Sequence, residues 1–218
     1  MINFKVKYLY SKETNFDLKL KEFLQIRNSF NIDIEQNVLD IINQIKTNGD
    51  SALITMINKF DKITCFELDK IENKLLKNAF EDLPINLKNA MKLASNRIKT
   101  FHEKQKIKGF DYKDELGVNL GLKYSPIKRV GFYTPGGKAL YPSSVLMNVV
   151  PALVAGVDER VLVSPINLEK SSDILLAAAY LAEVTEFYRM GGAHAIAALA
   201  LGTEKIKKVD KIVGPGNA

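Results

Sequence analysis

The segment Arg129–Val157 reads RVGFYTPGGKALYPSSVLMNVVPALVAGV, and it decides the fold. A short apolar run, a turn with two glycines and a longer apolar stretch follow one another, which predicts a strand, a turn and a helix. The same pattern recurs along the rest of the chain. The predicted strands are Arg129–Tyr133, Arg160–Val163, Glu186–Arg189 and Lys211–Val213, and the predicted helices are Ser143–Ala155, Ser171–Ala182 and Ala193–Leu201. Strands that alternate with helices form parallel sheets, so we predict an α/β fold with a parallel sheet over residues 126–218.

The first 125 residues carry apolar residues at helical spacing over most of their length. Asp17 is a candidate cap for the first helix, and Asn48-Gly49 is expected to separate two later helices, with Asp50 or Ser51 as the new cap. Alternation at Val118, Leu120 and Leu122 predicts a β-hairpin within residues 108–124. The predicted helices are Asp17–Arg27, Ile34–Lys46, Ala52–Phe60, Asp69–Phe80 and Pro84–Gln105.

Composition places the chain among ordinary globular proteins. It is 46% hydrophobic and 26% charged, with no apolar run long enough to cross a bilayer, so we expect no membrane association. The lone cysteine, Cys65, excludes an internal disulfide and, without a signal-peptide pattern, favours the cytoplasm. The net charge of +6 comes from lysines interspersed with acidic residues, so we interpret it as solvated surface and expect no nucleic-acid binding.

Turn-forming segments follow the predicted strands. Ligands of open α/β sheets bind beyond the carboxyl ends of the strands, where glycines let the backbone approach and helix N-termini offer N–H groups. The segments therefore predict a binding rim, although turn formation alone could also explain the glycines. No Gly-x-Gly-x-x-Gly or Walker-type loop is present, so a nucleotide would be held in a less common way. The rim segments are Tyr133–Lys138, Ser164-Pro165, Gly191–His194 and Gly214–Asn217.

Soft metal ligands are scarce, because His102, His194 and Cys65 are the only histidines and cysteine of the chain. A catalytic zinc usually takes three protein ligands that lie close together, often histidines. We therefore predict no metal site within this chain. His102 falls in a predicted amphipathic helix and is interpreted as a surface or packing residue.

Three long segments together carry a family resemblance: Arg129–Val157, Gly191–Thr203 (GGAHAIAALALGT) and Val209–Ala218 (VDKIVGPGNA). They resemble the histidinol dehydrogenase family, as do the shorter segments GDSAL at residues 49–53, KFD at 59–61 and TFH at 100–102. The resemblance implies NAD-dependent oxidation of L-histidinol to L-histidine through L-histidinaldehyde, in the last steps of histidine biosynthesis. It also implies a homodimer and one zinc per subunit. It further implies that residues 126–218 form an incomplete Rossmann-like domain, and that residues 1–125 contribute to a second α/β domain, which a missing C-terminal half completes.

The same resemblance assigns roles to single residues. It implies that Tyr133 and Asn217 contact NAD. His194 stands where the family has glutamine, and because a neutral imidazole also offers one donor and one acceptor, we expect it to contact the cofactor too. The helix N-terminus favours that neutral form. A tolerated substitution at the rim of the pocket remains an equal alternative.

The resemblance places the family's general base, the neighbouring glutamate and the zinc ligands beyond the end of this chain. We therefore expect no catalytic residue and no metal ligand here, and no dehydrogenase activity from the 218-residue chain alone. Two other functions stay open. One is a paralogous NAD-dependent alcohol dehydrogenase of the same fold, and the other is a non-catalytic nucleotide-binding module.

Overall fold

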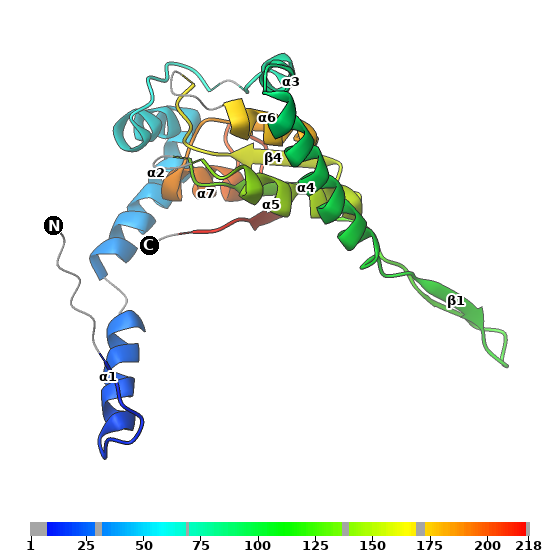
Figure 1. Ribbon diagram of the computed structural model, residues 1–218, viewed down its shortest axis with the longest axis horizontal. Coiled ribbons are helices and arrows are strands. Elements are labelled where there is room, and N and C mark those ends of the chain that lie inside the picture. The colour runs from blue at the N-terminus through cyan, green and yellow to red at the C-terminus, as the bar shows by residue number, and fades with distance from the viewer. Residues whose placement is uncertain (1–7, 29–31, 69, 137–139, 169–172, 217–218) are drawn as a thin grey trace. The chain divides into compact units, whose positions relative to one another are not determined.

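The computed structural model describes residues 8–28, 32–68, 70–136, 140–168 and 173–216 (Figure 1). The chain divides into two compact units, residues 1–40 and 41–218. The first unit contains helix α1 (Phe16–Asn28) and the beginning of helix α2 (Ile32–Met56). The second unit contains the described strands and the remaining helices.

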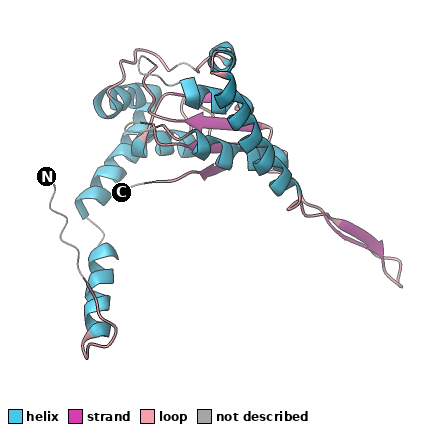
Figure 2. Ribbon diagram, viewed as in Figure 1, coloured by secondary structure: helices cyan, strands magenta, loops and turns pink. Residues whose placement is uncertain are grey.

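A parallel sheet of four strands forms the centre of the second unit (Figure 2). The strands β3 (Arg129–Tyr133), β4 (Glu159–Val163), β5 (Glu186–Tyr188) and β6 (Lys211–Val213) lie in the order β5-β4-β3-β6. The predicted α/β fold with a parallel sheet is thus confirmed. Because β6 pairs with β3 and not with β5, the strand order reverses between β3 and β6, which makes that boundary a topological switch point.

Helices cover both faces of this sheet. Alternate residues of each strand face opposite sides, so each strand contributes to two cores. Phe132, Leu162 and Phe187 belong to one core, which contains residues of α5 (Pro142–Ala155) and α6 (Asp173–Leu181). Val161, Val163 and Tyr188 belong to the other core, which contains residues of α7 (Gly192–Leu201). Buried apolar residues on both faces account for the nearly continuous apolar runs of the strands.

The N-terminal helices after Asp40 join the same two cores. Helix α3 (Asn73–Glu81) packs on α6, and helix α4 (Ile85–Glu103) packs on α5. The end of α2 and the π-helix η1 (Ile57–Asp61) join the core on the α7 face. The compact unit therefore extends back to Ile41. The division into residues 1–125 and 126–218 stays a prediction.

One predicted helix boundary was wrong and another was confirmed. Helix α1 begins at Phe16, so Asp17 lies in its first turn and does not cap it. The predicted break at Asn48-Gly49 is confirmed, because Gly49 has a non-helical backbone, with φ 50° and ψ −128°, and divides α2 into two helical segments at a kink. Neither neighbour acts as the expected cap: the Asp50 N–H donates to Glu204, and the Ser51 hydroxyl donates to the Asn48 carbonyl. Two predicted helix starts, Asp69 and Ser171, lie outside the described residues.

Replacing Gly49 by alanine is expected to lower the free energy of unfolding by about 1–3 kcal/mol, the cost of a non-glycine residue in a disfavoured backbone region. An added Cβ would also overlap the Glu204 carboxylate, which accepts the Asp50 N–H at 2.7 Å. Urea denaturation of Gly49→Ala, with the exposed neighbour change Asn48→Ala as the control, measures the effect. Equal stability of the two variants would contradict this account of the kink.

The predicted hairpin is confirmed as β1 (Phe110–Lys113) paired antiparallel with β2 (Asn119–Leu122). All eight strand residues are exposed. Gly117 occupies the turn with φ 85°, a backbone conformation that glycine adopts without steric cost. Among the helices in the described ranges, none combines the length and the apolar character that a membrane crossing requires.

Candidate functional site

The switch point brings two predicted rim segments into backbone contact. Tyr133 ends β3, and Gly214 follows β6, the neighbouring strand. A Cβ on Gly214 would overlap the Tyr133 carbonyl oxygen, and Gly214 has φ 151°, which L-residues rarely adopt. Tyr133 is partly buried against the core on the α7 face. Only glycine therefore allows the chain to pass this close to Tyr133 directly after β6.

Two other rim glycines pack against the neighbouring rim segment, which follows β4. A Cβ on Gly191 would lie 2.7 Å from Pro165 Cγ, and one on Gly136 would lie 2.5 Å from Ser164 Oγ. The rim segments thus interlock along the carboxyl edge of the sheet. Close packing is sufficient to require glycine at these positions, so the glycines alone do not establish a ligand site.

Two buried hydroxyl groups are the less expected feature of this edge. Thr134 and Ser164 follow β3 and β4 directly, and both side chains are fully buried. Within the described residues, neither Thr134 Oγ1 nor Ser164 Oγ has a hydrogen-bond partner. Because buried polar groups are usually paired, unpaired hydroxyls beside a rim fit a site that receives a polar ligand. The only sequence signal for them was a polar residue placed directly after each buried strand.

His194 lies near the beginning of α7 and is only 2% exposed. Its Nε2 lies 2.9 Å from Oδ2 of Asp61, at the end of η1, and the same oxygen accepts the Gly191 N–H at 3.0 Å. A carboxylate only accepts hydrogen bonds, so Nε2 carries a proton and the ring donates it. The Phe60 and His194 ring centroids are 5.8 Å apart.

The neutral form of His194 stays a prediction. No local pattern places Asp61 beside His194, since the two residues are 133 positions apart. Of the predicted cofactor residues, Tyr133 and His194 both lie on the α7 face of the sheet. Asn217 lies outside the described residues.

The strongest charge cluster lies at the opposite edge, where the strands begin. Arg129 begins β3 and pairs with Glu159 at 2.5 Å and with Glu186 at 2.8 Å, at the beginnings of β4 and β5. Tyr188 donates to Glu186 at 2.8 Å. Burial and the Glu186 carboxylate together raise the pKa of Tyr188. Because Arg129 and both glutamates lie at the amino edge of the sheet, we assign this network to stability.

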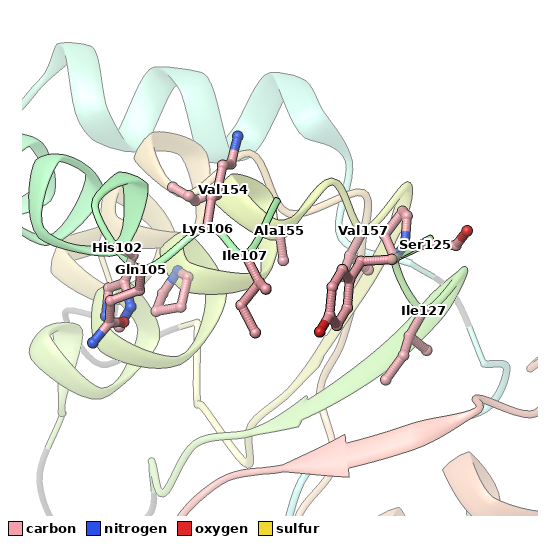
Figure 3. Close-up of a pocket in the computed structure, with 12 residues that line it drawn as sticks. His102, Gln105, Lys106, Ile107, Ser125, Ile127, Val154, Ala155 and Val157 are labelled. Carbon is pink, nitrogen blue, oxygen red and sulfur yellow. The ribbon is translucent and has the colours of Figure 1, made fainter. Parts of the chain in front are cut away.

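A cavity of about 500 Å³ lies between the end of α4, the base of the hairpin and the end of α5 (Figure 3). His102, Ile107, Val154 and Val157 are among its lining residues. Since Val157 precedes β4, this cavity lies near the amino edge of the sheet, away from the predicted rim. His102 therefore lies away from the rim. Among the described residues, no three of His, Cys, Asp and Glu converge to hold a metal ion.

A parallel sheet with helices on both faces, a switch point and a glycine-rich carboxyl edge defines the class of Rossmann-like α/β proteins. The comparison with known families is more specific. The profile of the histidinol dehydrogenase family matches residues 25–218, so this chain belongs to the histidinol dehydrogenase family.

Individual relatives agree with this assignment. The chain is 45% identical over 215 residues to histidinol dehydrogenase of Neisseria meningitidis serogroup A, covering 98% of this chain and 50% of that protein. It is 44% identical to histidinol dehydrogenase of Nitrosospira multiformis, covering 98% of this chain and 49% of that protein. The crystal structure of histidinol dehydrogenase from Elizabethkingia anophelis matches with a TM-score of 0.77 and 34% identity, over 84% of this chain and 42% of that one. The chain thus spans about half the length of the curated relatives.

Proposed function

We propose that this chain forms the cofactor side of an NAD-dependent histidinol dehydrogenase, a cytoplasmic oxidoreductase of histidine biosynthesis. The complete enzyme oxidises L-histidinol to L-histidine through L-histidinaldehyde. Family membership supports the reaction. The observation that carries the assignment of this half is the carboxyl edge at the switch point, where Tyr133 and Gly214 meet.

The residues at this edge fit a dinucleotide. Tyr133 offers a ring on the α7 face, His194 begins the adjacent helix, and Asn217 follows the Gly214–Gly216 turn. The buried hydroxyls of Thr134 and Ser164 provide two further donors below the rim. When bound, NAD accepts the hydride from the alcohol, and the share of these residues is to bind and orient it.

His194 reaches the cofactor through its second ring nitrogen in this proposal. Because Nε2 donates to Asp61, Nδ1 of a neutral ring carries no proton and can only accept a hydrogen bond. That edge of the ring lies against Gly192, since a Cβ on Gly192 would be 3.3 Å from both Nδ1 and Cε1. In this proposal, NAD contacts Nδ1 from the side of the turn at the beginning of α7.

Zinc, the homodimer and the catalytic base belong to the complete enzyme in this proposal. The described residues offer no converging metal ligands, so none of them is assigned to zinc. General-base oxidation needs a group within hydrogen-bond reach of the substrate hydroxyl, and we assign none in this chain.

Calorimetric titration of the 218-residue chain with NAD⁺ tests the cofactor assignment. We expect saturable binding, and no binding would overturn the assignment. NADH formation from L-histidinol is expected to be absent for the purified chain, and its appearance would contradict the assignment of the base elsewhere. If the complete enzyme oxidises another alcohol in preference to L-histidinol, the result favours a paralogous dehydrogenase. If the complete enzyme binds NAD⁺ but oxidises no alcohol, the result favours a non-catalytic module.

Replacing His194 by alanine is expected to weaken NAD⁺ binding about tenfold, the equivalent of one lost hydrogen bond. The His194→Gln change should alter affinity less, because an amide can also donate to Asp61 and accept from the cofactor. Titration calorimetry with His102→Ala as the control measures both changes, since His102 lines the remote cavity. Equal affinity of the wild type and both His194 variants would leave His194 as a tolerated substitution.

A further inference from the structure

Asp61 is a buried carboxylate whose observed partners all belong to the predicted cofactor rim. Its side chain is 8% exposed. The hydrogen bonds that it accepts within the described part of the chain come from His194 Nε2 at 2.9 Å and the Gly191 N–H at 3.0 Å. A buried charge is costly unless it is hydrogen-bonded, so these two contacts fix where the carboxylate can lie.

The two donors, Gly191 and His194, lie where the chain passes from β5 into α7. Gly191 is the N-cap residue of α7, and its backbone packs against Pro165 of the neighbouring rim segment. Gly192 follows with φ 58°, so the turn has a backbone that few other residues would adopt. Asp61 Oδ2 thus accepts hydrogen bonds both from the Gly191 backbone at the beginning of this turn and from the His194 side chain after it.

The segment that carries Asp61 is itself unusual. Asp61 ends the π-helix η1, and Lys62 follows in the left-handed region with φ 55°. π-Helical turns are rare and occur often at functional sites, and a non-glycine residue with positive φ costs free energy that the surroundings must offset. Here the backbone turns sharply at the residue whose side chain reaches the rim.

Phe60 completes the contact from the same segment. Its ring lies 5.8 Å from the His194 ring, centroid to centroid, and Lys59 Nζ lies 5.1 Å from the Phe60 centroid. Phe60 and Asp61 therefore both lie beside His194, and the edge of the ring that carries Nδ1 and Cε1 lies towards Gly192.

We infer that Asp61 is a positioning residue for the cofactor: it fixes the tautomer and orientation of His194 and the direction of the Gly191–Gly192 turn, without touching NAD itself. The inference rests on the proposed function. A carboxylate partner that orients a histidine and fixes which nitrogen carries the proton is a common device in functional sites. In this chain the partner comes from an N-terminal segment 133 residues before the histidine.

Titration of the 218-residue chain and its variants with NAD⁺ tests the inference. Asp61→Asn keeps the size of the side chain but replaces the charged acceptor. We expect the dissociation constant for NAD⁺ to rise about tenfold or more, because hydrogen bonds to charged groups contribute more than neutral ones. Asp111→Asn, on the exposed strand β1, is the matched control and should bind as the wild type does.

A double-variant cycle separates positioning from independent effects. If Asp61 acts through the turn, Asp61→Asn combined with His194→Ala should bind NAD⁺ within about twofold of Asp61→Asn alone. A loss equal to the product of the two single losses would overturn the inference. A merely structural role would lower the urea midpoint of Asp61→Asn while its folded fraction keeps the wild-type affinity, and that result would overturn it too.

A measurement on the wild type keeps the inference testable if Asp61→Asn fails to fold. Addition of NAD⁺ should shift the Gly191 amide and the His194 ring nitrogens in ¹⁵N-correlated spectra. Binding without these shifts overturns the inference but leaves the proposed function intact. No NAD⁺ binding by the wild type overturns the proposed function, and the inference with it.

Discussion

Replacing Arg129 by alanine is expected to lower the free energy of unfolding by about 3–5 kcal/mol, the usual cost of removing one partner of a buried ion pair. The Arg129 residue is 5% exposed and bridges Glu159 and Glu186 across the beginnings of three strands. Without the guanidinium, two carboxylates would remain next to each other. Glu186, whose side chain is 17% exposed, would be poorly solvated.

Urea denaturation of Arg129→Ala measures this loss. Lys77→Ala is the control, because the exposed pair of Lys77 and Glu81 should contribute less than about 1 kcal/mol. The double change Arg129→Met with Glu186→Gln should recover part of the loss, since it leaves no uncompensated charge at Glu186. Equal stabilities of Arg129→Ala and Lys77→Ala would contradict a structural role for the network.

The same network predicts how stability depends on acid. Burial alone would raise the pKa of Glu186, but hydrogen bonds from Arg129 and Tyr188 and the charge of Arg129 outweigh burial and hold it below its ordinary value of 4.5. A depressed carboxyl pKa stabilises the fold fully above the unfolded value, and this stabilisation is lost as the pH falls through the folded pKa. Unfolding free energy should therefore fall below pH 4.5, and less steeply in Arg129→Ala.

Local sequence patterns predicted the sheet well. The observed bounds of β3 and β6 equal the predicted Arg129–Tyr133 and Lys211–Val213, and α7 begins one residue before the prediction. Short apolar strands next to turn-forming residues leave little freedom in where they begin and end. The same patterns also indicated that Tyr133 and Gly214 share one edge, because carboxyl ends of parallel strands meet there.

Long-range contacts explain what the patterns missed. The patterns placed the break at Gly49 but not its partner Glu204, whose carboxylate accepts the Asp50 N–H from 154 positions away. Buried His194 pairs with Asp61, and neither residue carries a local signal of the other. Helix propensity and capping rules describe neighbours in sequence, so tertiary partners of this kind remain invisible to them.

The second large effect is expected at the switch point. Replacing Gly214 by alanine should lower the free energy of unfolding by about 2–4 kcal/mol, because disfavoured backbone and overpacking each cost about 1–3 kcal/mol. The added methyl would overlap the Tyr133 carbonyl oxygen, and relief of that overlap requires β6 to move away from β3. Since Tyr133 lies next to Gly214 at the edge that this movement would open, NAD⁺ binding should weaken as well.

Gly216 provides a matched control within the same turn. An added Cβ there would meet no atom within 4 Å, so Gly216→Ala should change stability by less than about 0.5 kcal/mol. Urea denaturation and NAD⁺ titration of both variants distinguish a glycine needed for close packing in the protein from one needed for close approach of the cofactor. Equal destabilisation would contradict the packing role of Gly214. If the cofactor approaches the backbone closely at Gly216, Gly216→Ala should lose NAD⁺ affinity while its stability stays unchanged. No described residue requires glycine at that position, so such a loss would come from the cofactor.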